Sequence, residues 1–231
     1  MHLPWSKEGK LIKAIKDSNL EKVENLLFSG ANPNTMDAAD RSVLLHAIAR
    51  GNSHIVLCLL KAGANANGVT NVEPLKNHTP LMSAYDYTIV THLLAFGGNP
   101  NAINGDGWTP LMFASSDGAK EIVQLLLDAG ADIDATDNLR RTSIGLATHN
   151  NHIDVVKLLI DHSANLNIQS ESGTSPLIMA STNGSIEIVR LLIEAKAEVN
   201  LKGAFGITAL KGAESLSHKD IIDILKDAGA E

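Results

Sequence analysis

One short unit decides the fold of this chain: Thr109-Pro110-Leu111-Met112-Phe113-Ala114, followed by Glu121-Ile122-Val123-Gln124-Leu125-Leu126-Leu127 and Gly130-Ala131-Asp132. Thr is a favoured residue just before a helix and Pro is tolerated at the first helical position, so a helix is predicted from Pro110 to about Ser116. Asp117-Gly118 is a turn signal. The apolar face of residues 122–127 predicts a second helix, and Gly130 stands where helices commonly end in a left-handed residue.

The same unit recurs along the chain. Copies aligned on Thr109 begin at Gly9, Ser42, Thr79, Thr109, Thr142, Ser175 and Thr208. Four of the spacings are 33 residues, and the other two are 37 and 30. A 33-residue period that opens with T-P-L-x-x-A is typical of ankyrin repeats, and the chain resembles that family over essentially its whole length. The resemblance implies an all-α solenoid of stacked helix-turn-helix units with projecting β-hairpin-like loops.

A repeat array has no single central core, because each repeat contacts its neighbours. We therefore expect residues 1–231 to form one ankyrin-repeat domain, divided at 9–41, 42–78, 79–108, 109–141, 142–174, 175–207 and 208–231. The first and last copies carry charged residues opposite their apolar face, as Lys10, Lys13, Lys211 and Glu214 show. Terminal repeats must expose a face that inner repeats bury, so we expect these two copies to be the caps of a complete array.

Composition excludes several classes of protein. The net charge is −7 and no run of Lys or Arg stands out, which argues against nucleic acid as a partner. No apolar stretch approaches the ~18–20 residues that span a bilayer, and the start has no signal-peptide core. Cys58 is the single cysteine, so no intramolecular disulfide forms, and we expect it to be a buried apolar filler. These features favour a soluble, cytoplasmic monomer, either native to its cell or delivered into a host cell.

Two copies depart from the standard length. The second copy's loop is four residues longer, and the extra length falls within residues 68–78, around Pro74 and Leu75. Neutral drift and a role in binding explain it equally well. The third copy lacks three residues at the end of its first helix, where Tyr85-Asp86-Tyr87-Thr88 stands instead. Three residues are close to one helical turn, so we expect shorter helices that keep their apolar face.

Other departures concern single positions. Five copies place Gly at the end of the second helix, but Ser163 and Lys196 take that position in the fifth and sixth. Either the turn differs there or strain is tolerated, since a left-handed conformation costs a non-Gly residue about 1–2 kcal/mol. No copy has the His that follows T-P-L in the family pattern. Gly145 lowers helix propensity by about 1 kcal/mol relative to Ala, so the fifth copy is expected to be a weak point.

Nothing in the sequence indicates catalysis. His149 and His152 are close together but flank a turn, and no Cys or carboxylate cluster completes a tetrahedral metal set. Gly105-Asp106-Gly107 is a turn at a loop tip rather than a phosphate-binding loop, because no G-x-x-x-x-G-K-[ST] pattern follows. We therefore expect a protein that is not an enzyme and that uses no metal or cofactor.

The family resemblance implies a protein–protein interaction scaffold that binds its partner in a concave groove made of loop tips and first helices. An alternative with the same surface is a regulatory inhibitor or effector that masks an enzyme or host protein. Carried onto this chain, and joined to the long loop and the central aromatics, the predicted partner-binding residues are Arg41, Arg50, Pro74, Leu75, Tyr85, Tyr87, Asp106, Trp108, Asp117, Leu139, Arg141, His149 and Phe205.

Aromatic residues gather near the middle of the chain. Phe96 ends an apolar second helix and Phe113 matches Leu146 and Met179, so both are expected in the core. Trp108 stands at a loop-tip position that holds different residue types elsewhere, and Trp and Tyr are enriched at interface hot spots. We expect residues 68–78, Tyr85, Tyr87, Asp106 and Trp108 to form the centre of the partner site. The competing interpretation is that the tyrosines fill the gap left by the deletion.

The resemblance also points to a modification. Loop-edge asparagines of ankyrin proteins can be hydroxylated in the animal cytosol, and the matching positions here are Asn34, Asn67, Asn101, Asn167 and Asn200, with Asp134 in the fourth copy. The alternative, which we favour, is that these side chains satisfy backbone groups of a turn.

Overall fold

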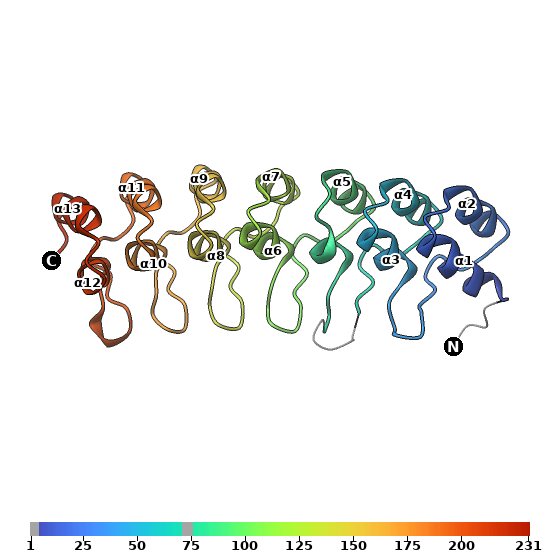
Figure 1. Cartoon of the computed structure of the whole chain (residues 1–231), viewed down its shortest axis with the longest axis horizontal. Coiled ribbons are helices and arrows are strands. Elements are labelled where there is room, and N and C mark those ends of the chain that lie inside the picture. Colours follow the sequence, from blue (N-terminus) through green and yellow to red (C-terminus); the bar gives the residue numbers. More distant parts are fainter. Residues whose placement is uncertain (1–4, 71–75) are drawn as a thin grey trace. The chain divides into compact units, whose positions relative to one another are not determined.

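The computed structural model describes residues 5–70 and 76–231, and these are all-helical, as predicted. Helices alternate with loops that project beside the first helix of each pair (Figure 1). Two isolated bridges, Met36–Ser42 and Thr70–His78, give two of these loops a hairpin character. The elements are α1 (Lys7–Lys16), α2 (Leu20–Phe28), α3 (Val43–Ala49), α4 (Ser53–Lys61), the 3₁₀ turn η1 (Pro80–Ser83), α5 (Tyr87–Ala95), α6 (Pro110–Ser116), α7 (Lys120–Asp128), α8 (Ser143–His149), α9 (Ile153–Asp161), α10 (Pro176–Asn183), α11 (Ile186–Glu194), η2 (Ala204–Gly206), α12 (Ala209–Ser215) and α13 (Lys219–Asp227).

The first helices begin where the repeat pattern places a hydroxyl residue. Thr109 accepts a hydrogen bond from the Met112 amide through its side chain, and Thr142 does the same for Gly145. Such a cap satisfies one of the amide groups that a helix start leaves unpaired. The sequence therefore placed the start of α6 correctly, and its end at Ser116 agrees as well.

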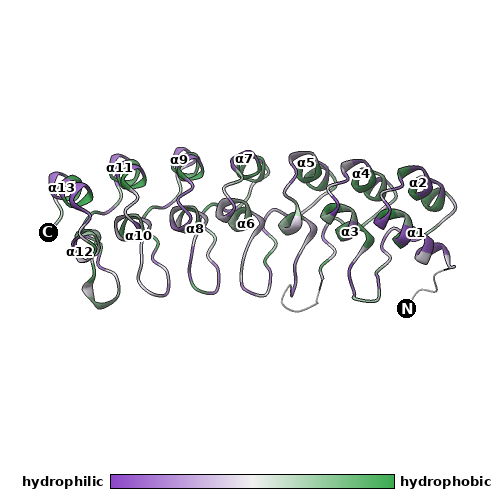
Figure 2. Ribbon diagram, viewed as in Figure 1, coloured by the Kyte–Doolittle hydropathy of each residue, from purple (hydrophilic) through white to green (hydrophobic). Residues whose placement is uncertain are grey.

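The chain divides into two compact units. The first holds residues up to 105 together with 128–130, and the second holds 106–127 and 131–231. In the first unit α1 packs on α2 and α3, and α4 packs on α5. In the second, α8 lies between α6 and α10, and α10 also contacts α11 and α12. In Figure 2, helices such as α11 and α13 are hydrophobic on one side and hydrophilic on the other, so they are amphipathic.

Asparagine side chains tie several repeats to the repeat that follows. The Asn67 amide nitrogen donates to the carbonyl of Gly97 at 2.8 Å, and its oxygen accepts from the Asn99 amide at 2.7 Å. Asn34 makes the equivalent pair of bonds to Gly63 and Asn65. In the second unit, Asn200 bonds in the same way to residues 229 and 231. These asparagines do satisfy backbone groups, but the groups belong to the following repeat rather than to the same turn.

The helix-end position keeps one conformation whichever residue occupies it. Gly30, Gly63 and Gly130 have φ of 89°, 94° and 82°, and Ser163 and Lys196 have φ of 64° and 67°. Of the two alternatives left by the sequence, tolerated strain is therefore the one realised. The neighbouring repeats set the path of the chain, and two L-residues adopt the left-handed conformation at an energetic cost.

Helix bounds in the first and third copies differ from the regular repeat. In the first copy, α1 begins at Lys7, before the aligned repeat position Gly9, because the Ser6 side chain caps it by accepting from the Gly9 amide. In the third copy the deletion leaves only the four-residue η1, but α5 keeps nine residues. Asp86 explains the full length of α5, since its side chain accepts from the Ile89 amide and starts the helix anew.

Two predictions about burial were also wrong. Phe96 follows the last residue of α5 and is 42% exposed, because the helix ends before its side chain can turn inward. Cys58 is half-buried, as is Leu125 at the same position of the fourth copy, because it flanks the buried face formed by Ile55, Val56, Leu59 and Leu60.

Tyr85 and Tyr87 are 65% and 54% exposed, which contradicts the interpretation that they fill the gap left by the deletion.

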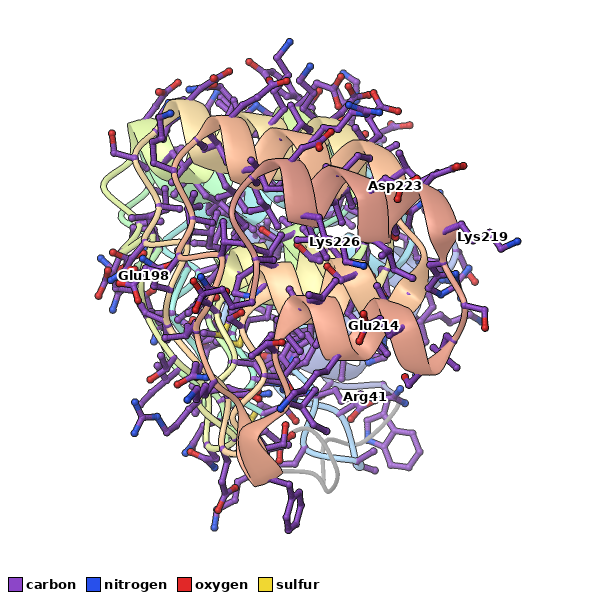
Figure 3. The ribbon with its side chains drawn as sticks, turned by 90° about the vertical axis from the view of Figure 1, so that its left-hand side faces the viewer. Arg41, Glu198, Glu214, Lys219, Asp223 and Lys226 are labelled. Carbon is purple, nitrogen blue, oxygen red and sulfur yellow. The ribbon has the colours of Figure 1, made fainter. Side chains whose placement is uncertain are left out.

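The last helix pair presents a charged outer side. Glu214 on α12 and Lys219, Asp223 and Lys226 on α13 are all exposed, and Figure 3 shows them on the side of this pair that faces the viewer. Ile221 and Leu225 of α13 are buried against the preceding helices. This helix pair is therefore amphipathic, as expected from its sequence.

Candidate functional site

The loop tips of the second unit are tied to one another through their backbones. The Asn138 amide donates to the carbonyl of Asp106 at 3.0 Å, and the Glu171 amide donates to the carbonyl of Leu139 at 2.8 Å. These bonds hold neighbouring tips in register. The predicted site residues Asp106 and Leu139 are therefore placed by main-chain contacts while their side chains remain exposed.

Two adjoining pockets lie between these loops and the first helices. The first, of about 160 Å³, is lined by Arg141, Gly145 and His149 among others. The second, of about 480 Å³, is lined by Ile178, Phe205 and Ile207 among others. The two pockets share His149, Thr174 and Met179. The structure thus brings together Arg141, His149 and Phe205, three of the residues predicted from the sequence, along one continuous surface.

Phe205 has an unusual conformation for a loop residue. Its exposed fraction is 102% of the reference value, and its φ is 57°, in the left-handed region. In the other described loops, the residue at the same repeat position has a negative φ, and Leu139 and Ser172 are two examples. A non-Gly residue in this region is strained by about 1–3 kcal/mol, and such strain clusters at ligand-binding segments. The turn Ala204–Gly206 therefore presents a phenyl ring to solvent at an energetic cost.

Trp108 is half-buried rather than projecting freely from its loop tip. Its ring centroid lies 4.9 Å from that of Phe113 at an interplanar angle of 53°, and the guanidinium carbon of Arg141 lies 5.3 Å above it. Arg141 is held in turn by Asp137, with Nε and Nη2 at 2.7 and 2.6 Å from Oδ2. Contrary to the sequence argument, packing does use the aromatic ring at this position.

The described site residues predicted in the first unit line neither of these two pockets. Arg41 lies 3.6 Å from Asp37, which also accepts from His46 at 2.8 Å. Burial alone would raise the pKa of Asp37, but hydrogen bonds from the Arg41 and Ala39 backbone and from His46 hold that pKa below its ordinary value. Arg50, Tyr85 and Tyr87 are exposed, and Pro74 and Leu75 lie outside the described residues.

The sequence missed several residues that line the pockets. Arg140, Leu146, Ile168 and Met179 were not proposed, although all line the first pocket. The signal in the sequence that could have indicated this pocket is Gly145, because other copies hold larger residues at that position. From the sequence alone, Gly145 predicts only a weak point of the helix. Asp117 was proposed and is exposed at the end of α6, away from the residues that line either pocket.

The described residues offer little reactive chemistry. His152 contacts the carbonyl of Ser116 at 2.9 Å, so its ring serves packing between repeats. Burial, and to a smaller extent the charge of Glu24, raises the pKa of the Cys58 thiol, and Lys61 opposes this increase only in part. The raised pKa favours the protonated thiol, which is the less nucleophilic form. Within the part of the chain that is described, no group of three or more His, Cys, Asp or Glu side chains is placed to hold a metal ion.

Comparison with models of protein families identifies the family of this chain. A model described as Ankyrin repeats (3 copies) matches residues 11–102 and again 84–170, and a second, Ankyrin repeats (many copies), matches 158–213. The chain belongs to the ankyrin-repeat family. Ankyrin-repeat folds are generally protein–protein interaction scaffolds and are typically non-enzymatic.

Curated ankyrin-repeat relatives are much longer than this chain. Glycerophosphocholine phosphodiesterase gde1 of Schizosaccharomyces pombe is 32% identical over 116 residues, which make up 50% of this chain and 7% of that protein. Ankyrin repeat and SOCS box protein 6 of Homo sapiens is 32% identical over 149 residues, covering 58% of this chain and 35% of that protein. The similarity thus spans only a minor part of each relative.

Solved ankyrin-repeat domains resemble the chain over nearly all of its length. The ankyrin repeat domain of Bcl-3, described as a unique member of the IkappaB protein family, has a TM-score of 0.84 at 32% identity, covering 94% of this chain and 97% of that one. The human ASB11 domain has a TM-score of 0.81 at 25% identity, covering 96% and 98%. In the described residues, none of the helices combines the length and apolar character needed to cross a bilayer.

Proposed function

We propose that this chain is a non-catalytic scaffold that binds a partner protein through the loop tips and first helices of its second unit. The observation that supports this proposal is the exposure of Phe205. A fully exposed phenyl ring on a strained turn is unfavourable in the free protein, and its burial by a partner would recover the lost hydrophobic free energy. Aromatic anchors beside apolar pockets are typical of interface hot spots, and Phe205 lines such a pocket with Ile178 and Ile207.

Charge supports a protein rather than nucleic acid as the partner. The second unit carries 10 Lys and Arg residues against 17 Asp and Glu residues, so it holds the whole net charge of −7. An acidic surface repels phosphate groups, whose binding depends on Lys and Arg. With a single cysteine, the chain suits a reducing compartment, and we place its action in the cytoplasm, as a monomer.

Measurement of partner affinity tests the proposal. The partner is captured with the intact chain from cells that express it and then purified, and its affinity is measured for Phe205→Ala. We expect at least a tenfold loss, about 1.4 kcal/mol. The matched control is Phe28→Ala, because Phe28 is equally exposed at 97% but lies at the end of α2 in the first unit.

The two variants separate the surfaces clearly. A loss with Phe205→Ala and less than a twofold change with Phe28→Ala supports the proposed surface. Equal affinities for wild type and Phe205→Ala would refute it. A loss with Phe28→Ala alone would move the site to the first unit.

A further inference from the structure

Gly145 leaves a gap on the side of α8. At the same position the other copies hold side chains, namely Ile12, Leu45, Met82, Met112, Ile178 and Lys211. A Cβ built on Gly145 would meet only Thr142 Oγ1, at 3.4 Å, which is a contact that packing tolerates. Gly212 of α12 differs, since its Cβ would lie 2.7 Å from Thr182 Oγ1. Close packing therefore requires Gly212 but does not require Gly145.

The gap opens into the smaller of the two pockets. Leu146, Ile168, Pro176 and Met179 supply its apolar walls. Its volume of about 160 Å³ is similar to that of an apolar cavity that admits benzene, about 150 Å³. The space therefore suits a single side chain of the size of leucine or phenylalanine.

Three hydroxyl groups that line this pocket already bond within the chain. Thr142 Oγ1 accepts from the Gly145 amide at 3.3 Å, and Ser175 Oγ accepts from the Ile178 amide at 3.3 Å. Ser170 Oγ accepts from the Thr174 amide at 3.2 Å. An apolar occupant leaves these bonds intact.

Charged side chains stand at the edge of the pocket. Arg141 is paired with the buried carboxylate of Asp137. Arg140 is exposed at the pocket edge, and Glu171, next to the lining residue Ser170, is exposed with the opposite charge. A charged side chain that entered the apolar part of the pocket would lose its hydration, which is costly.

We propose that the Gly145 pocket receives one bulky apolar side chain from the partner protein. This inference rests on the function proposed above and names the chemistry that the surface recognises. Gly145 acts as a specificity-determining residue, because its missing side chain creates the receptacle.

Capped amino acids test the pocket directly. The full chain, labelled at Leu, Ile and Met methyl groups, is titrated with N-acetyl-L-leucinamide and, separately, with N-acetyl-L-aspartamide and N-acetyl-L-argininamide. We expect leucinamide to shift the Leu146 and Met179 signals saturably. Gly145→Met, which introduces the residue found at positions 82 and 112, should weaken this binding at least tenfold. Gly145→Ala is the matched control: it also adds helix propensity but leaves most of the space open, so it should bind as wild type does.

Three results would overturn the inference: no shift at these methyl groups, equal binding by Gly145→Met, or charged probes that bind as tightly as leucinamide. Affinity for the purified partner then separates this inference from the proposed function. If Gly145→Met binds the partner normally while Phe205→Ala does not, the pocket inference fails and the scaffold surface stands. If both bind normally, the surface itself is wrong.

Discussion

The guanidinium carbon of Arg141 lies 5.3 Å from the centroid of the Trp108 ring. The Phe113 ring also contacts this indole, with the two ring centroids 4.9 Å apart and the rings tilted. Asp137 fixes the guanidinium through two contacts to one carboxylate oxygen. Trp108 therefore links the loop before α6 to the loop before α8, and it has a structural role whether or not a partner binds it.

Trp108→Ala should lower stability as well as partner affinity. Truncation of a fully buried large aromatic costs about 3–5 kcal/mol, and a half-buried ring should cost about 1–2 kcal/mol in urea unfolding. Trp108→Phe keeps part of the stack and should cost less. An unchanged unfolding midpoint for Trp108→Ala would contradict the packing seen here, and a partner affinity reduced no further than by Trp108→Phe would remove Trp108 from the proposed site.

The sequence predicted the fold well because the repeat signals are local. Thr109 and Pro110 define a helix start by their own chemistry, and Gly130 defines a helix end. Errors arose where an element depends on its surroundings. The full length of α5 depends on the cap from Asp86, and the exposure of Phe96 depends on where that helix ends.

The candidate site was harder to predict than the fold. Loop-tip residues such as Phe205 follow from the repeat register, but the left-handed turn that exposes it does not. The pocket beside Gly145 exists only because α8, α10 and two loops meet around it. Sequence alone shows that a side chain is missing, but not whether neighbouring residues close the gap.

Asn67 tests the bonds between repeats. Asn67→Ala removes the bonds to Gly97 and Asn99, and the net loss should be about 1 kcal/mol in urea unfolding. Asn67→Asp keeps the acceptor, as Asp134 does naturally toward the Asn165 amide at 2.8 Å, so it should cost less than Ala. Equal losses for the two variants would mean that the acceptor contributes nothing.

Ser163→Gly and Lys196→Gly should each stabilise the chain. Both residues are held left-handed, and Gly adopts that conformation without the penalty, although its greater unfolded entropy limits the gain to about 1 kcal/mol. Thermal unfolding of each variant measures the effect. The reverse change, Gly130→Ser, should destabilise, because nothing lies within 4 Å of its Cβ position and only backbone strain enters. Lower midpoints for both Gly variants would show that no strain is stored.

His78 should make the first unit sensitive to acid. Burial lowers the pKa of His78 below its ordinary value of 6.5, and a hydrogen bond with the Met82 backbone offsets only part of this effect. The unfolded chain thus binds the proton more readily, so stability is complete above pH 6.5 and declines as the pH falls below it. His78→Gln should lose less stability than wild type between pH 7 and pH 5 in urea titrations. If the unfolding free energies of wild type and His78→Gln change equally with pH, His78 does not contribute to the acid sensitivity.

Photo-crosslinking tests the central claim, partner binding through the second unit, most directly. p-Benzoyl-phenylalanine is placed at position 205 or, as the control, at position 28, where an equally exposed Phe stands. On irradiation with the purified partner, we expect a covalent adduct from position 205 and none from position 28. Adducts from position 28 alone, or equal yields from both, would contradict the account.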